Sequence, residues 1–117
     1  MIKYFTNNFS IINLYKSAST KSEIVTQMIY GDSFSVLKKT RKWLKIKIKE
    51  DNYKGYIQNK NFRNYLIPSH KISVLKANVY NSPNLKKKRY ELSFGSKIKV
   101  TRKKGIFLKF DRGWIKN

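Results

Sequence analysis

The chain contains no cysteine, one histidine, two prolines and five glycines among its 117 residues. Without cysteine it forms neither a disulfide scaffold nor a thiolate zinc site, and it carries no cysteine nucleophile. A single imidazole, His70, excludes a site in which several histidines hold a metal. We therefore predict neither a metal site nor a cofactor.

Acidic residues are also scarce. The sequence has 6 aspartates and glutamates against 27 lysines and arginines, which gives a net charge of +21. A surface this positive attracts polyanions such as nucleic acid, anionic lipid or an anionic cell-wall polymer. Non-specific binding to polyanions is therefore expected whatever the specific ligand is.

Long apolar runs are missing as well. No stretch approaches the roughly 18 apolar residues that a membrane span requires. The first ten residues, MIKYFTNNFS, lack the uninterrupted apolar stretch of a signal peptide. The sequence predicts neither a membrane span nor an export signal.

The residues that catalysis would need are not arranged for it. No serine lies in a G-x-S-x-G motif. Glu50 and Asp51 are adjacent in one polar turn, whereas a glycosidase pair faces across a cleft. His70 follows Pro68 and Ser69 in a segment without other chemistry. We therefore predict no catalytic residue, and that this chain alone is not an enzyme.

An internal repeat organises the chain. Four blocks of the first half recur in the same order in the second half. The pairs begin at Asn13 and Asn78, Gly31 and Gly95, Trp43 and Phe107, and Lys54 and Arg112. The offset between copies is 65, 64, 64 and 58 residues, and its one large change follows the third block, where the first copy has a longer hairpin tip. Two similar strands in one sheet would not reproduce four blocks in register.

The periodicity within each copy is that of strands. In residues 43–49 aliphatic side chains occupy every second position, which places Leu44, Ile46 and Ile48 on one face of a strand. No segment has the pattern of a long amphipathic helix. The sequence predicts an all-β protein with two small barrels or sandwiches. Their predicted bounds are a leader at 1–10, a first domain at 11–60, a linker at 61–70 and a second domain at 71–117.

The repeated pattern resembles that of bacterial SH3-like (SH3b) domains. Its parts are Asn-Leu-Tyr-x-Ser, a variable loop, Gly-Asp, an alternating strand, Trp-Leu-Lys-Ile and Gly-Tyr-Ile, and the first copy carries all of them. The second copy departs by having Ser96 after Gly95 and Phe107 in place of tryptophan. The resemblance implies two SH3-like β-barrels in tandem.

Residues 11–117 together also resemble the N-terminal half of NlpC/p60-type cysteine peptidases from alphaproteobacteria. The stretches SEIVTQMIYGDSF, RKWLKIKIKE, LKANVYNSPN and LSFGSKIKV carry this resemblance. In that family a catalytic domain with a cysteine nucleophile and a histidine base follows and cleaves peptidoglycan peptides. This chain has no cysteine, so no catalytic residue of the family is carried over. The resemblance implies a module that targets a peptidase and a location in the cell envelope. The lack of a signal-peptide pattern does not support that location.

Four aromatic side chains are candidates for a ligand groove. Trp43 shares a strand face with Lys45 and Lys47, away from the predicted core, and its repeat partner Phe107 does the same with Lys109. Such rings either stack on a sugar or peptide or cover the mouth of the barrel, and the sequence leaves both readings open. The repeated tyrosines, Tyr15 and Tyr80, complete the candidate groove, although a tyrosine at the edge of the core is the plainer reading of both.

Two further aromatics, Tyr56 and Trp114, follow the repeated glycines Gly55 and Gly113. We expect these two rings to close the barrels and to belong to the core.

Runs of lysine and arginine recur in equivalent loops. A charge run is usually a solvated loop, but its repetition predicts one basic edge on both domains, which would bind polyanions with affinity that falls as salt rises. The predicted basic edge comprises Lys38, Lys39, Arg41, Lys42, Lys86, Lys87, Lys88, Arg89, Arg102, Lys103 and Lys104.

Three functions are compatible with these patterns. The leading hypothesis is a non-catalytic module that binds peptidoglycan peptide or glycan and positions a C-terminal peptidase domain. The first alternative is a basic β-barrel that binds nucleic acid by stacking and backbone contacts. The second is a structural module that docks on a catalytic domain and binds nothing itself.

Overall fold

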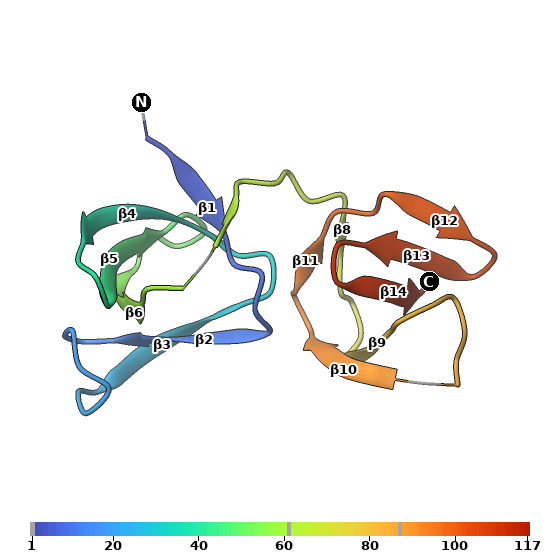
Figure 1. The fold of residues 1–117 in the computed structure, drawn as a ribbon, viewed down its shortest axis with the longest axis horizontal. Coiled ribbons are helices and arrows are strands. Elements are labelled where there is room, and N and C mark those ends of the chain that lie inside the picture. The colour runs from blue at the N-terminus through green and yellow to red at the C-terminus, as the bar shows by residue number, and fades with distance from the viewer. Residues whose placement is uncertain (1, 61, 87) are drawn as a thin grey trace. The chain divides into compact units, whose positions relative to one another are not determined.

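The computed structural model describes residues 2–60, 62–86 and 88–117. These residues form fourteen strands and no helix, so the predicted all-β class is confirmed. The chain divides into two compact units, Met1–Leu66 (unit 1) and Ile67–Asn117 (unit 2). The strands of each are labelled in Figure 1.

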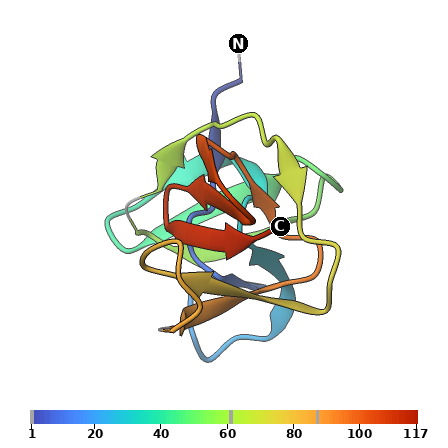
Figure 2. The same ribbon diagram turned by 90° about the vertical axis from the view of Figure 1, so that its right-hand side faces the viewer.

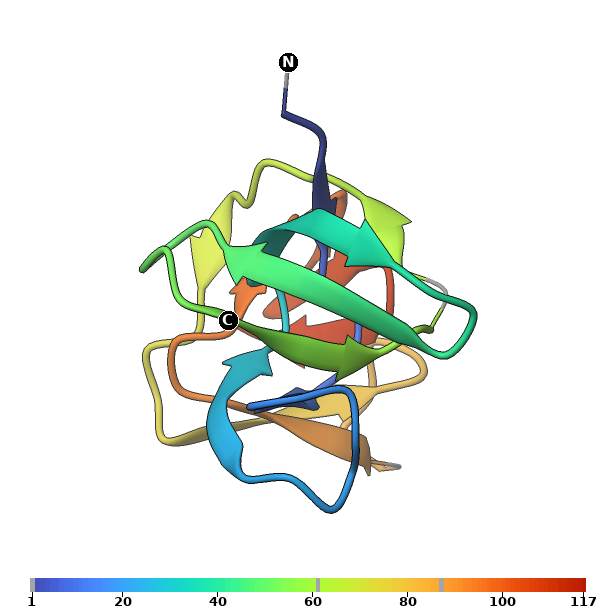
Figure 3. The same ribbon diagram turned by 90° about the vertical axis from the view of Figure 1, so that its left-hand side faces the viewer.

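Unit 1 is built on one seven-stranded sheet with the order β3-β2-β6-β5-β4-β1-β7. Figure 3 shows β4, β5 and β6 running side by side. The strands are β1 (Tyr4–Thr6), β2 (Ile11–Tyr15), β3 (Ile24–Ile29), β4 (Ser33–Lys39), β5 (Trp43–Ile48), β6 (Lys54–Gln58) and β7 (Arg63–Asn64).

Strand β5 shows why the sequence folds this way. Leu44, Ile46 and Ile48 are buried, and the side chains between them are half-buried, as the two-residue alternation predicts. The inward side chains join one core whose other buried members are Ile12, Leu14, Met28, Phe34 and Ile57. The strands of this unit therefore form a single sheet folded around one apolar interior.

The predicted leader contributes a strand to this sheet. Its strand β1 pairs with β4 on one side and with β7 on the other. Asn7, which is fully buried, fixes the chain after β1. Its amide group donates to the carbonyls of Phe9 and Ile29, at 3.0 Å each, and its Oδ1 accepts from the Phe9 N–H at 2.9 Å. Residues 4–9 are thus tied to the rest of unit 1.

Unit 2 repeats the strand order of unit 1. Its five-stranded sheet has the order β10-β9-β14-β13-β12, which corresponds strand for strand to β3-β2-β6-β5-β4 (Figure 2). A two-stranded sheet, β8 with β11, completes it. The strands are β8 (His70–Lys71), β9 (Lys76–Tyr80), β10 (Lys88–Ser93), β11 (Lys97–Ile98), β12 (Arg102–Lys104), β13 (Phe107–Phe110) and β14 (Gly113–Lys116).

The same turn precedes β4 in unit 1 and β11 in unit 2. Gly31 and Gly95 have φ values of 88° and 87°, a region that glycine enters without steric cost. In unit 1 the Asp32 carboxylate accepts a hydrogen bond from the Ile29 N–H at 2.9 Å, which stabilises the turn. The repeated glycines of the sequence therefore mark equivalent turns.

The segment predicted as a linker contributes to both units. Arg63 and Asn64 form β7, and the Leu66 N–H donates to the Thr6 hydroxyl of β1 at 3.0 Å. His70 begins β8, which pairs with β11 of unit 2. The boundary between the units falls between Leu66 and Ile67.

The described residues include no helix long and apolar enough to cross a membrane.

Candidate functional site

An aromatic trio lies on the outer face of unit 1, on the side of β5 and β6 opposite the core. It consists of Tyr15, Trp43 and Tyr56. The Tyr15 and Trp43 rings meet edge to face, with centroids 5.7 Å apart and an interplanar angle of 88°. Tyr15 and Tyr56 are partners across β2 and β6. The Lys45 ammonium lies 5.8 Å from the centroid of the Tyr56 ring. Strand pairing therefore brings together three rings that are distant in sequence.

Unit 2 carries the equivalent trio, which consists of Tyr80, Phe107 and Trp114. The Tyr80 and Phe107 rings are 6.1 Å apart at 86°, and Tyr80 is the partner of Trp114 across β9 and β14. The Lys109 ammonium lies 5.8 Å from the Trp114 ring, and the Arg102 guanidinium lies 5.7 Å from it. Each trio therefore combines rings with at least one cation.

The structure corrects the prediction for Tyr56 and agrees with that for Trp114. Trp114 is buried as predicted, at 7% exposed, in one core cluster with Tyr80 and Phe107. Tyr56 was also expected in the core, but it is half-buried and lies beside Lys45 with the predicted groove aromatics of unit 1. In unit 1 the core residue of this strand is the neighbouring Ile57, at 0% exposed. The alternation of strand faces could have revealed this, since adjacent strand residues point to opposite sides.

The two trios differ in how much ring surface they present. Tyr80, Phe107 and Trp114 are only 7–8% exposed. Tyr15, Trp43 and Tyr56 are half-buried. Beside the unit 1 trio lies a hollow of about 160 Å³, whose wall residues are Ala18, Lys38, Thr40, Trp43, Lys45 and Tyr56. Unit 1 therefore offers the more accessible surface for a ligand.

This arrangement suits a ligand with a flat face and a negative charge. Half-buried tyrosine and tryptophan rings contribute contact area while their polar edges stay in water. Lys38 and Lys45 line the same hollow and add positive charge beside the rings. A sugar ring or a peptide plane that carries a carboxylate meets both requirements.

The basic run of unit 1 lies at the hairpin between β4 and β5. Lys38 and Lys39 end β4, and Arg41 and Lys42 form the turn before β5. All four side chains are exposed.

The corresponding run of unit 2, Arg102–Lys104, forms β12 and is also fully exposed. The other run of unit 2 lies elsewhere. Lys86, Lys88 and Arg89 are exposed at the start of β10, at the opposite end of the sheet order from β12, while Lys87 lies outside the described residues. The sheet order of unit 2 thus separates its two basic runs.

The Tyr90 phenol and the Lys49 ammonium have shifted pKa values, and neither belongs to an aromatic trio. Burial raises the pKa of the Tyr90 phenol above its ordinary value of 10.0, and its hydroxyl donates to the Arg112 carbonyl at 3.2 Å. A hydrogen bond with Tyr65 raises the pKa of the Lys49 ammonium, which donates to the tyrosine oxygen at 2.8 Å. Both groups stabilise local structure.

The acidic groups and the histidine have structural contacts. The Glu50 carboxylate accepts from the Ser33 N–H at 3.2 Å. His70 shares a hydrogen bond of 2.8 Å with the Ser69 hydroxyl and is exposed. Within residues 2–60, 62–86 and 88–117, no three of the acidic and histidine side chains gather as metal ligands would.

Comparison with known proteins gives a match to a family model and similarity to solved structures. Residues 14–62 match the family model described as the bacterial dipeptidyl-peptidase SH3 domain. No curated protein sequence matches the chain significantly. The solved structure of NlpC2 from Trichomonas vaginalis is similar at 15% identity and a TM-score of 0.44. That similarity covers 98% of this chain and 44% of the NlpC2 chain.

Proposed function

We propose that this chain, in which residues 14–62 form a bacterial SH3-like domain of a peptidase-associated family, is a non-catalytic module that binds peptidoglycan. In a larger assembly it would hold a peptidase domain close to its peptide substrate. The observation that carries the proposal is the half-buried aromatic trio of unit 1 with a lysine beside it. Unit 2 repeats the three aromatic positions and the lysine, but its rings are buried.

The ligand that fits the trio is a stem peptide or its attached sugar. Tyr15 and Trp43 offer ring faces and edges for a sugar or peptide plane, and Lys45 and Lys38 attract the carboxylates of the polymer. Unit 1 is the main binding unit in this proposal, because its rings are half-buried whereas those of unit 2 are almost covered.

The test is a pull-down on purified, nucleic-acid-free peptidoglycan at low and high salt. Trp43→Ala is compared with the wild type and with Tyr53→Ala, which removes an aromatic ring, 43% exposed, at the far hairpin tip of unit 1. A double variant with Phe107→Ala adds the equivalent ring of unit 2. We expect the wild type and Tyr53→Ala to remain bound at high salt and Trp43→Ala to be released.

Binding that disappears with salt for every protein would contradict the proposal, because it would reflect charge alone. Retention of Trp43→Ala and of the double variant at high salt would contradict the assignment of the site to the trios.

A further inference from the structure

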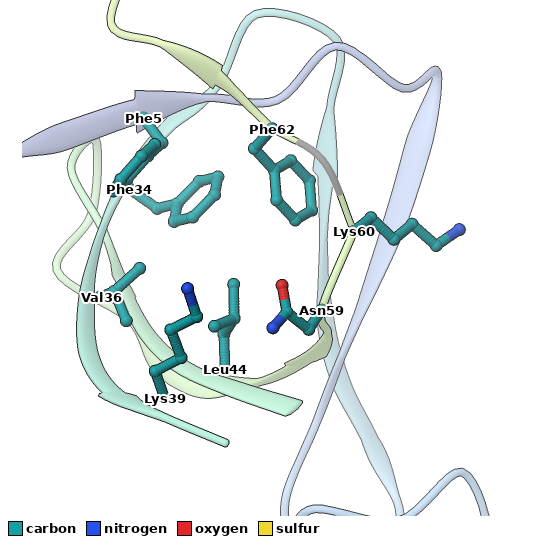
Figure 4. Close-up of a pocket in the computed structure, with 8 residues that line it drawn as sticks. All are labelled: Phe5, Phe34, Val36, Lys39, Leu44, Asn59, Lys60 and Phe62. Atoms are coloured by element: carbon teal, nitrogen blue, oxygen red, sulfur yellow. The ribbon is translucent and has the colours of Figure 1, made fainter. Parts of the chain in front are cut away.

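A second hollow opens at the mouth of the unit 1 barrel, and neither the aromatic trio nor the basic runs explain it. Its volume is about 310 Å³, at the lower end of the range typical of small-molecule sites. Figure 4 shows its side chains, except that of Lys60, converging on one space. The lining residues are Phe5, Phe34, Val36, Lys39, Leu44, Asn59, Lys60 and Phe62. We call this hollow the barrel-mouth pocket.

The walls of the pocket are apolar. Phe34 lies between two other rings, with its centroid 5.9 Å from that of Phe5 and 5.0 Å from that of Phe62. Phe34 and Leu44 are buried, and Phe5, Phe62 and Val36 pack against the same core while remaining partly accessible. An apolar group that entered would gain contacts that water cannot supply.

Two polar groups stand at one side of this apolar space. In Figure 4 the Lys39 ammonium and the Asn59 side-chain oxygen point into the pocket, whereas Lys60 points away from it. The Lys60 ammonium lies instead over the Phe9 ring, 4.9 Å from its centroid.

The orientation of the Asn59 amide is set by its own hydrogen bonds. Its nitrogen donates to the carbonyls of Thr40 and Arg41, at 3.2 and 3.3 Å. The oxygen is thereby turned toward the pocket, where it accepts no hydrogen bond from any described residue. The pocket thus combines an apolar interior with one cation and one acceptor.

Unit 2 does not repeat these walls. The repeat places Ile98 where unit 1 has Phe34, and strand pairing places His70 where unit 1 has Phe5. The cation and the amide do recur, as Lys103 and Asn117. The ring-lined pocket is therefore a property of unit 1, and Lys103 is a matched control for Lys39.

We propose that the barrel-mouth pocket binds the C-terminal residue of a peptide when that residue has an apolar side chain. The side chain fills the space among the three phenylalanines. The terminal carboxylate pairs with Lys39, and the N–H of the same residue donates to Asn59. The pocket volume suits one residue, and the net charge of +21 favours an anionic ligand.

This inference is independent of the proposed peptidoglycan site. Leu44 lines the pocket, whereas its neighbour Trp43 belongs to the outer trio, so the two sites lie on opposite faces of β5. Either site can fail its test while the other holds.

The experiment is a titration of the isotope-labelled chain, followed through its backbone amide NMR signals. The probes are N-acetyl-leucine, N-acetyl-leucinamide and N-acetylglycine at about physiological ionic strength. We expect N-acetyl-leucine to shift the amide signals of Phe5, Asn59 and Phe62. N-acetylglycine should bind at least about ten-fold more weakly, because it lacks the apolar side chain. The uncharged amide should bind about three-fold more weakly, as one exposed ion pair allows.

Two lysine variants complete the design, and neither removes a buried side chain. Lys39→Gln should abolish the preference for N-acetyl-leucine over N-acetyl-leucinamide, whereas Lys103→Gln should leave this preference intact. Equal binding of N-acetyl-leucine and N-acetylglycine, or signal shifts confined to other parts of the chain, would overturn the proposal. So would an acid preference that survives Lys39→Gln.

Discussion

Gly113 is a residue at which the backbone tolerates little change. Its φ of 146° lies in a region that residues with a side chain rarely adopt. A methyl group there would lie 2.5 Å from the Tyr80 carbonyl oxygen and 3.0 Å from a Val79 methyl carbon. The repeated glycine therefore lets β14 approach β9 closely, which brings Trp114 next to Tyr80.

We expect Gly113→Ala to lower the free energy of unfolding of unit 2 by about 2–3 kcal/mol, through backbone strain and overpacking. Urea denaturation followed by Trp114 fluorescence in a Trp43→Phe background measures it. Gly105→Ala is the control, because Gly105 also has a positive φ of 58° but no atom within 4 Å of the added methyl. Its cost should stay near 1 kcal/mol. Equal losses for the two variants would contradict the close-approach argument.

Tyr90 gives unit 2 a stability that depends on pH. Because burial raises the pKa of its phenol, the folded state holds this proton more tightly than the unfolded state does. The contribution of the protonated phenol to the free energy of unfolding is therefore complete below the ordinary pKa of 10.0. It is lost as the pH rises through the pKa of the folded state. The stability difference between wild type and Tyr90→Phe should shrink above about pH 10. Urea unfolding of both proteins at a series of pH values tests this prediction. A stability difference that stays constant across about pH 10 would contradict it.

At the scale of elements, strand β1 of unit 1 corresponds to β8 of unit 2, and the repeated sequence blocks predicted neither strand. Strand β1 adds to the edge of β4 and is held by the hydrogen bonds of the buried Asn7. The backbone of Asn7 adds two more, since its N–H donates to Asp32 and its carbonyl accepts from Gly31, at 2.8 and 2.9 Å. One asparagine therefore connects β1 to the turn before β4.

We expect Asn7→Ala to destabilise unit 1 by about 1–3 kcal/mol, because it removes three part-buried hydrogen bonds, two of them to the Phe9 N–H and carbonyl. Chemical denaturation followed by Trp43 fluorescence in a Trp114→Phe background measures the loss. Asn13→Ala removes only an exposed hydrogen bond with Gln27 and should cost less than about 0.5 kcal/mol. Similar losses for both variants would show that Asn7 does not anchor β1.

At the scale of the whole molecule, charge dominates long-range behaviour. A net charge of +21 produces affinity for any polyanion, in addition to any specific site. For a single-stranded oligonucleotide we expect the affinity to fall by about a thousand-fold or more between 50 and 200 mM salt, as counterion release dictates. Fluorescence anisotropy at several salt concentrations measures the slope. A shallow slope would favour stacking-based nucleic-acid binding over charge alone.

Much of the fold could be predicted from the sequence because its determinants are local. The two-residue alternation of β5 and the repeated glycine turns are set by neighbouring residues, and they predicted the strands and their inner faces. The SH3-like pattern that begins at Asn13 is confirmed by the family match over residues 14–62. The outward position of Trp43 followed from the same alternation.

The remaining features depend on contacts between residues that are far apart in sequence. Pairing of β2 with β6 and of β5 with β6 brings Tyr56 into the aromatic trio, and no local pattern specifies which strands pair. The barrel-mouth pocket likewise needs Phe5 and Phe62 to converge on Phe34 from opposite ends of unit 1. The sequence by itself thus determined the strands and their faces, whereas only the tertiary structure decided which faces meet, because long-range pairing and packing bring them together.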